Sequence, residues 1–185
     1  MGKTVAGLRV TLDGIAGDAD RWFAPYAPGQ VQAALGANMA AMGTMVLGRR
    51  TYEIFSGAFA GQQNPVADIM NSTPKVVVST TLEKADWNNS TVIGGDVVAT
   101  LAKLKTESEK DVRVVGSLSL IRQLLAQRAL DELELFVHPI VLGHGERLFD
   151  ESLGELMLAV ASSETFDNGV IHVIYRPAEE ETRRS

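Results

Sequence analysis

The stretch Leu47–Glu53 reads LGRRTYE and joins a short apolar run to a segment with helical character. The apolar residues before it predict a buried strand that runs into Gly48, and residues 50–55 predict the start of a helix. The N-terminus of a helix carries free N–H groups and the positive end of the helix dipole, which favour a bound phosphate. Two cations and a hydroxyl stand at this junction, which therefore predicts an anion site at Arg49, Arg50 and Thr51.

Two further junctions carry the same kinds of group. VVVSTTL at Val76–Leu82 places hydroxyls after a second apolar run, and VVGSLSLI at Val114–Ile121 places a glycine and two serines before a helical pattern. Ligands of α/β sheets gather at the carboxyl ends of the strands, where all three predicted strand-to-helix junctions would lie. A glycine with a hydroxyl at a helix start is also ordinary capping chemistry, so each junction alone has that second interpretation.

The spacing of apolar residues predicts an α/β fold over the whole chain. Helices are expected at 29–42, 97–105 and 118–125, and residues 13–28 and 56–73 are expected to be irregular. Strands are expected at 4–12, 45–48, 75–79, 91–93, 112–115, 133–137, 156–161 and 170–176. Strands alternate with helices until strands dominate the end of the chain. We therefore expect a single domain over 1–177, with a central mixed, mostly parallel sheet flanked by helices and antiparallel C-terminal strands. Residues 178–185 are expected to form a loose charged tail.

Composition excludes several classes of protein. The chain has 17 basic and 23 acidic side chains, a net charge of −6, which does not favour nucleic-acid binding. It has no cysteine, which excludes disulfides, thiol nucleophiles and cysteine-ligated zinc and fits a reducing, cytoplasmic location. No apolar core of signal-peptide length opens the chain, and prolines and glycines interrupt the uncharged stretch 22–48, so no membrane association is expected. His138, His144 and His172 lack metal-ligand spacing, so no metal site is expected.

The order of six segments resembles a known family. They are VTLDGIAG at Val10–Gly17, LGRRTYE, MNSTPKVVVSTTL at Met70–Leu82, VIGGDVVATLAKLK at Val92–Lys105, VRVVGSLSLIRQLL at Val112–Leu125 and ALDELELFVHPIVLGHGERLF at Ala129–Phe149. Together they are similar to the RibD C-terminal domain family, the riboflavin-pathway reductase domain and its stand-alone relatives, within the dihydrofolate-reductase-like superfamily. The resemblance implies a dihydrofolate-reductase-like fold, NADPH as cofactor and a homodimer, with the segment 129–149 as the region to search for the dimer contact.

The resemblance also implies which residues hold the cofactor. The first two junctions would surround the adenosine 2′-phosphate with Gly48, Arg49, Arg50, Ser79 and Thr80, while Thr51 would lie nearer the pyrophosphate. A guanidinium with hydroxyl neighbours suits a phosphate dianion. The turn before the next helix would take the pyrophosphate at Val115, Gly116, Ser117, Leu118 and Ser119. Relatives usually carry two consecutive glycines here, and a serine at the second position narrows the allowed backbone geometry.

The nicotinamide would lie near the first strand and its loop, around Leu12–Gly17. Asp13 resembles the aspartate of the family's S-L-D-G segment and could orient a substrate hydroxyl or relay a proton. Asp-Gly is also a common turn, so Asp13 could instead only cap that loop. Trp22, Phe23 and Tyr26 could stack on a flat substrate or pack as a staple. The predicted substrate pocket contains Gly14, Ile15, Trp22 and Asn38.

One expected carboxylate is absent. Folate-reducing relatives carry an acidic residue on the helix before this arginine segment, whereas this chain has no Asp or Glu at 22–52. The neutral helix, with Gln30, Gln32 and Asn38 as its strong polar groups, argues against a folate substrate. An equally simple explanation is that this helix lies in a core or a dimer contact.

Charged residues elsewhere are open to two interpretations. Asp131, Glu132 and Glu134 could act as paired acid/base carboxylates, but such a set is more often a solvated strand face or the start of a dimer contact. A phosphorylated pathway substrate would need a second basic site, for which the chain offers Arg21, Arg113 and Arg147.

We therefore expect an NADPH-dependent reductase that transfers hydride to a small heterocyclic or sugar-amine substrate. By resemblance, its activity is similar to that of 5-amino-6-(5-phosphoribosylamino)uracil reductase of riboflavin biosynthesis. The deaminase domain that often accompanies this reductase needs a zinc site with cysteines, which this chain cannot supply. The alternative is a non-catalytic or differently specific nucleotide-binding module of the same fold, which the missing helix carboxylate and the Gly116–Ser117 pair favour.

Overall fold

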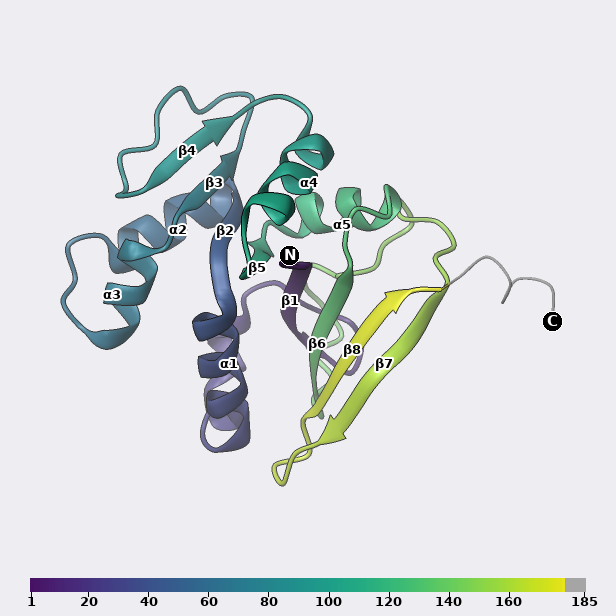
Figure 1. The fold of residues 1–185 in the computed structure, drawn as a ribbon. Helices are drawn as coiled ribbons and strands as arrows, with labels where there is room; N and C mark the ends of the chain where they lie inside the picture. The colour runs from purple at the N-terminus through teal and green to yellow at the C-terminus, as the bar shows by residue number, and fades with distance from the viewer. Residues whose placement is uncertain (179–185) are drawn as a thin grey trace.

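The structure is a computed structural model that describes residues 1–178 (Figure 1). Eight strands form one sheet in the order β4-β3-β2-β5-β1-β6-β8-β7. The strands are β1 (Thr4–Thr11), β2 (Met42–Gly48), β3 (Lys75–Val78), β4 (Ser90–Ile93), β5 (Asp111–Gly116), β6 (Glu132–His138), β7 (Leu158–Thr165) and β8 (Ile171–Pro177). The helices are α1 (Gln30–Ala41), α2 (Arg49–Phe59), α3 (Pro65–Ser72), α4 (Val97–Glu107) and α5 (Leu118–Ala126), with short 3-10 turns η1 (Ala19–Arg21) and η2 (Ala24–Tyr26).

Neighbouring strands from β4 to β6 are all parallel. The last two strands differ, because β8 pairs antiparallel with both β6 and β7. This arrangement confirms the predicted α/β fold with antiparallel C-terminal strands. Parallel strands end at the same edge of a sheet, so the carboxyl ends of β1, β2, β3 and β5 meet along one edge of the molecule.

The two faces of the sheet are covered by different helices (Figure 1). Alternate residues of β2 divide between them: Val46 packs in the core beneath α4 and α5, while Met45 and Leu47 pack with Tyr52 of α2. Helix α1 covers β6 on the same face as α2, where Val31 contacts a cluster with Phe136. The parallel strands are therefore apolar on both faces, as buried parallel sheets require.

Three predictions about individual helices and strands are wrong. Residues 65–72 form α3 rather than an irregular segment, because the Asn64 side chain accepts the N–H of Ala67 and Pro65 begins the helix. Strand β2 starts at Met42, three residues before the predicted start, because residues from Met42 onward already pair with β5. No helix follows the second junction, since the chain runs in a loop from β3 to β4.

The predicted tail begins one residue too early. The backbone N–H of Ala178 donates to the carbonyl of Met157 at 3.1 Å, so Ala178 still belongs to the folded part. Residues 179–185, the remainder of the predicted loose tail, lie outside the described residues.

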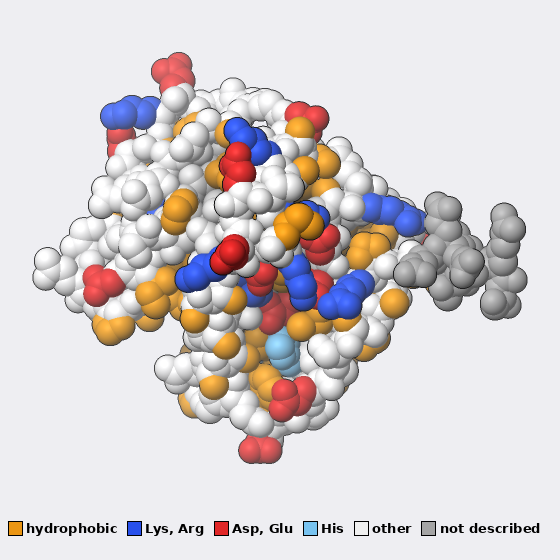
Figure 2. Space-filling view, viewed as in Figure 1, with side chains coloured by type: hydrophobic (Ala, Val, Ile, Leu, Met, Phe, Trp, Pro, Cys, Tyr) orange, Lys and Arg blue, Asp and Glu red, His pale blue; other side chains and the backbone are white. Residues whose placement is uncertain are grey.

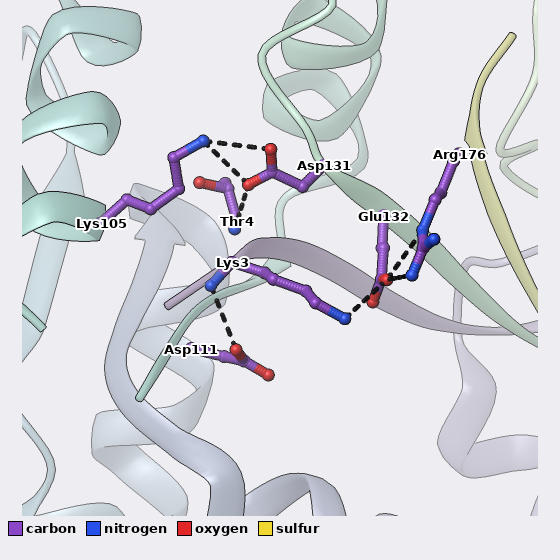
Figure 3. A network of polar contacts seen from close by, with 7 residues as sticks. All are labelled: Lys3, Thr4, Lys105, Asp111, Asp131, Glu132 and Arg176. Atoms are coloured by element: carbon purple, nitrogen blue, oxygen red, sulfur yellow. Dashed lines mark hydrogen bonds and ion pairs between the residues drawn. The ribbon is translucent and has the colours of Figure 1, made fainter. Parts of the chain in front are cut away.

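Charged side chains cross-link the amino end of the sheet (Figure 3). Glu132 accepts hydrogen bonds from Lys3 at 2.8 Å and from Arg176 at 2.6 Å. Asp131 accepts the backbone N–H of Thr4 and the ammonium of Lys105. These contacts join β1, β6, β8 and α4 at the edge opposite the predicted cofactor residues.

A second ion pair lies deeper on the face that α1 covers. Glu134 contacts Arg113 and also accepts hydrogen bonds from Asn38 at 2.8 Å and His172 at 2.7 Å. Both partners of the Arg113–Glu134 pair are buried. The expectation of a solvated acidic face is therefore wrong for Glu132 and Glu134, because β6 lies between two strands and its acidic residues face cations.

Candidate functional site

A cleft of about 1250 Å³ runs along the carboxyl edge of the sheet. It extends from the ends of β3 and β4, past β2 and β5, to β1 and the loop that follows it. All eleven residues predicted to hold the cofactor line it: Gly48, Arg49, Arg50, Thr51, Ser79, Thr80, Val115, Gly116, Ser117, Leu118 and Ser119. Three segments far apart in the sequence thus meet at one site.

The cleft opens where β1 and β5 separate. Their pairing ends at Ala6 and Val114, although β1 continues to Thr11. Leu8 and Arg9 therefore line the cleft instead of facing a neighbouring strand on that side. Such a gap between parallel strands is a usual location for ligands in α/β proteins.

Two glycines bring the first and third junctions into contact. A Cβ on Gly116 would lie 2.6 Å from Oγ1 of Thr51, and the φ angle of Gly116 is +140°, which side chains rarely adopt. A Cβ on Gly48 would lie 2.6 Å from Oγ of Ser117. The glycine and threonine of GRRT are therefore needed, at least in part, for close packing against the β5–α5 turn.

Serine fits at the second position of that turn. Ser117 has φ −74° and ψ 168°, which is extended backbone open to any residue. The narrower range of φ and ψ that serine allows therefore includes the conformation found here. The Ser117 hydroxyl lies 2.9 Å from that of Ser119, so the turn presents two hydroxyls to the cleft.

The two helices that begin at the cleft, α2 and α5, lack side-chain caps. Neither Gly48 before α2 nor Ser117 before α5 makes a side-chain cap hydrogen bond. By contrast, Asp96 caps α4 by accepting the N–H of Ala99 at 3.0 Å. Two helix N-termini at the cleft thus keep backbone donors free for an anion.

The second junction is a capped loop. The Ser79 hydroxyl accepts the backbone N–H groups of Thr81 and Leu82, so its acceptor capacity stabilises the turn after β3. Arg49 donates to Thr81 at 2.8 Å and pairs with Glu53 at 2.7 Å. Arg50 is exposed and makes no hydrogen bond or ion pair with any described residue, which leaves its guanidinium available at the cleft.

Asp13 lies outside the residues that line the cleft. Its carboxylate accepts hydrogen bonds from the Thr11 hydroxyl at 2.6 Å and from the N–H groups of Leu142 and Gly143. The Thr11 hydroxyl and then the Gly143 N–H lower the pKa of Asp13 to about 2. A carboxylate that stays ionised is a poor proton donor at neutral pH, so these contacts support the loop-capping interpretation.

The four predicted pocket residues are not brought together in the cleft. Ile15 and Trp22 are buried, Gly14 forms the turn after β1, and Asn38 faces Glu134 beneath α1. Trp22 packs edge-on against the ring of His138 with Phe23 and Tyr26, so these aromatic residues form packing contacts.

His138 is enclosed by this aromatic cluster. Its Nδ1 faces the carbonyls of Phe136 at 2.8 Å and Val10 at 3.2 Å and must therefore carry the proton. Its Nε2 is buried without a hydrogen-bond partner. Burial lowers the pKa of His138, so the ring is neutral. No group of three or more His, Asp or Glu side chains within residues 1–178 could hold a metal ion.

Sequence reasoning missed Arg9. This arginine lies in β1, lines the cleft beside Asp20 and places its guanidinium 4.3 Å from the ring centre of Phe23. Burial lowers its pKa, and the charge of Asp20 acts in the opposite direction. A strand position within LRVTL carries no motif, so only the separation of β1 from β5 identifies this residue as part of the site.

Comparison with known proteins identifies the family. The model of the RibD C-terminal domain matches residues 3–172. The chain belongs to the RibD C-terminal domain family. Two proteins of Bacillus subtilis (strain 168), the uncharacterized proteins YyaP and YwjB, are each 28% identical, over 71% and 91% of this chain and 72% and 94% of their own lengths.

Solved structures share the fold at low sequence identity. A putative riboflavin biosynthesis protein from Shewanella sp. PV-4 has a TM-score of 0.77 at 22% identity, covering 96% of this chain and 99% of its own. The Thermotoga maritima deaminase/5-amino-6-(5-phosphoribosylamino)uracil reductase has 0.66 at 16%, covering 96% and 57%. Enterococcus faecalis dihydrofolate reductase, complexed with NADP(H), has 0.62 at 15%, covering 96% and 98%. These likenesses establish a dihydrofolate-reductase-like fold.

Proposed function

We propose that this protein is an NADPH-dependent reductase whose cofactor lies along the carboxyl edge of the sheet. The observation that carries the proposal is the pair of uncapped helix N-termini, α2 and α5, in one large cleft with Arg50, which has no partner among the described residues. Backbone N–H groups and a guanidinium are the groups that bind phosphates. The complex of the E. faecalis relative with NADP(H) supports the choice of cofactor.

The order of the strands gives the cofactor a direction. The end of the cleft at β3 and β4 offers Arg50, Ser79 and Thr80 for the 2′-phosphate, and the β2–β5 contact offers the α2 and α5 N-termini for the pyrophosphate. The nicotinamide end then lies beside Leu8 and Arg9, where β1 and β5 separate. When bound, NADPH supplies hydride, and the protein binds, orients and excludes water.

We infer that the substrate is a small heterocycle or sugar amine reduced at a C=N or C=O group. The family match and the reductase named for the T. maritima relative support this class. The neutral helix α1 still argues against folate. This helix has no carboxylate. The buried carboxylate that its Asn38 contacts, Glu134, already pairs with Arg113 and His172.

Two measurements test this function. NADPH at millimolar concentration should raise the melting temperature, and a panel of pyrimidines, pterins and quinones should contain a compound that oxidises NADPH when protein is added. No thermal shift and no calorimetric heat with NADPH would overturn the cofactor assignment. Binding without oxidation across the panel would support the alternative, a nucleotide-binding module without turnover.

We also propose a homodimer, with strand β7 as its contact. Within the segment 129–149 first expected, strand β6 is internal to the sheet and offers no free edge. Strand β7 is an edge strand whose residues after Leu158 are all exposed, including Val160 at 61%. Long exposed edge strands are usually covered or paired. Sedimentation should therefore show a dimer that Val160→Lys weakens, while a monomer in the unmodified protein would reject the proposal.

Location follows from the same proposal. No helix within residues 1–178 is long and apolar enough to cross a membrane. We propose a cytoplasmic site of action, because the chain lacks cysteine and the proposed reaction consumes NADPH. Fractionation of cells that produce the tagged protein tests this, and recovery with membranes would contradict it.

A further inference from the structure

Arginine side chains in the described residues fall into two groups. Five have acceptors in the protein: Arg49, Arg113, Arg122, Arg147 and Arg176. The others make no hydrogen bond or ion pair within residues 1–178. Of these, Arg21, Arg50 and Arg128 are exposed and remain solvated, whereas Arg9 is half-buried. A guanidinium withdrawn from water without an acceptor is costly, so its position needs an explanation.

The surroundings of Arg9 fix its orientation without satisfying its donors. Phe23 lies beneath the guanidinium at 4.3 Å, which leaves the N–H groups at the edge of the plane free. Asp20 lines the same end of the cleft, but no carboxylate of the described residues lies within ion-pair distance. Stacking on a ring and an open edge together make a pre-oriented fork for an acceptor with two oxygens.

Arg9 also lies at the correct end of the cleft for a substrate. The proposed phosphate sites at β2, β3 and β5 are separated from it by the width of the opening between β5 and β1. It shares its part of the cleft with Leu8 and the loop residues Ala16–Asp20, which belong to none of the proposed phosphate contacts.

We propose that Arg9 is the substrate-recognition group of this cleft and binds an oxyanion, a carboxylate or a phosphate, carried by the substrate. That the bound anion belongs to a substrate rests on the proposed function, whereas the anion site itself does not. The planar guanidinium donates two parallel N–H bonds to such a group. Arg9 thus selects anionic heterocycles over neutral ones of the same shape, and it takes no part in hydride transfer.

Matched pairs of probes test the preference. Orotate and uracil differ by a carboxylate, and uridine 5′-phosphate and uridine differ by a phosphate. Each is titrated by calorimetry into the full-length protein saturated with NADPH. We expect the anionic member of at least one pair to bind at least tenfold more tightly, and the pair that shows this identifies carboxylate or phosphate as the ligand. Equal affinities within both pairs would overturn the proposal.

Variants locate the preference. Arg9→Gln should abolish it while the variant still binds NADPH, and Arg9→Lys, which keeps the charge without the fork, should retain part of it. Arg128→Gln makes the same charge change at an exposed site outside the cleft and should retain all of it. A preference unchanged in Arg9→Gln would overturn the assignment. If Arg9→Gln does not fold, the loss or retention in Arg9→Lys decides.

Failure of the proposed function can be distinguished from failure of the Arg9 anion site. If NADPH does not bind, the reductase assignment fails, and orotate and uracil are compared on the protein without cofactor. A preference for orotate that Arg9→Lys weakens would then keep Arg9 as an anion site in a protein of different function. No preference would remove it.

Discussion

The amino half and the carboxyl edge of the same sheet differ in whether their buried or cleft-lining charges are paired. In the amino half, Glu132 faces Lys3, just before β1, and Arg176 of β8 (Figure 3). Glu134 faces Arg113 of β5 in the same half. At the carboxyl edge, Arg9 and Arg50 have no acceptor among residues 1–178. Charges paired inside the protein stabilise the fold, whereas cations left without an acceptor beside a cleft are free to bind a ligand.

The paired charges of the amino half also appear on the surface. Figure 2 shows charged side chains of both signs together over β1, β6 and β8, with a histidine among them. The paired residues Lys3, Glu132, His172 and Arg176 belong to these strands and the N-terminus. A patch of mixed, mutually paired charges offers little net field to a ligand, so its size alone does not mark a functional site.

The largest effect on stability should come from the buried pair. Glu134→Gln leaves Arg113 buried without its counter-charge, and breaking such a pair costs about 3–5 kcal/mol. Urea unfolding measures the loss. The control is Glu53→Gln, which breaks the exposed pair with Arg49 and should cost no more than about 0.5 kcal/mol. Equal losses in the two variants would contradict the claim that paired charges of the amino half hold the fold together.

Gly116→Ala should have the next largest effect. The added Cβ meets Thr51, and the φ of +140° is strained for alanine, which together cost about 2 kcal/mol or more. Because the β2–α2 and β5–α5 junctions would separate, NADPH affinity should fall at least tenfold. Gly57→Ala in α2 meets no atom within 4 Å and should stabilise the protein by about 0.5–1 kcal/mol. Wild-type stability and NADPH affinity in Gly116→Ala would show that the junction contact is unimportant.

A smaller effect is expected from acid. The pKa of His138 is lowered in the folded state, whereas an unfolded histidine has a pKa of about 6.5. Below that pH the unfolded chain binds a proton that the folded chain does not, so stability should be full above about pH 6.5 and fall as the pH drops below it. The slope is at most about 1.4 kcal/mol per pH unit for one proton.

Two histidine variants isolate this slope by urea unfolding at several pH values. His138→Gln should remove it between pH 5 and 6.5, while His144→Gln, an exposed control, should keep it. The lowered pKa values of Glu134 and Asp13 act only below about pH 4.5 and do not interfere. A slope that survives in His138→Gln would show that the buried ring is not its source.

The sequence predicted most of the sheet and the three segments that meet at the cleft, because both depend on local patterns. Apolar runs and the glycine and hydroxyl junctions are visible within short windows, and the ends of parallel strands necessarily meet. Helix α3 was missed although Asn64-Pro65 carried a start signal, because the surrounding glycines suggested a loop.

Long-range contacts could not be predicted in the same way. The burial of Glu132 and Glu134 depends on cations from distant strands, and the exposure of Arg9 to the cleft depends on where β1 leaves β5. Lys75 illustrates the same limit. It appeared only as the first residue of a strand, yet its ammonium is buried over Trp87, donates to the carbonyls of Thr73 and Asn88, and has its pKa lowered by burial to about 8.

The variant with the smallest expected effect on stability gives the most direct test of the proposed NADPH site. Arg50→Gln removes an exposed cation that has no partner within residues 1–178, and it should change stability by no more than about 0.5 kcal/mol. Calorimetric titration of NADPH and NADH into the wild type should show NADPH binding at least tenfold more tightly, and Arg50→Gln should lose most of that difference by weakening NADPH alone. Arg128→Gln should leave both affinities unchanged. No heat with millimolar NADPH, or equal losses for NADPH and NADH in Arg50→Gln, would contradict an NADPH site at the carboxyl edge.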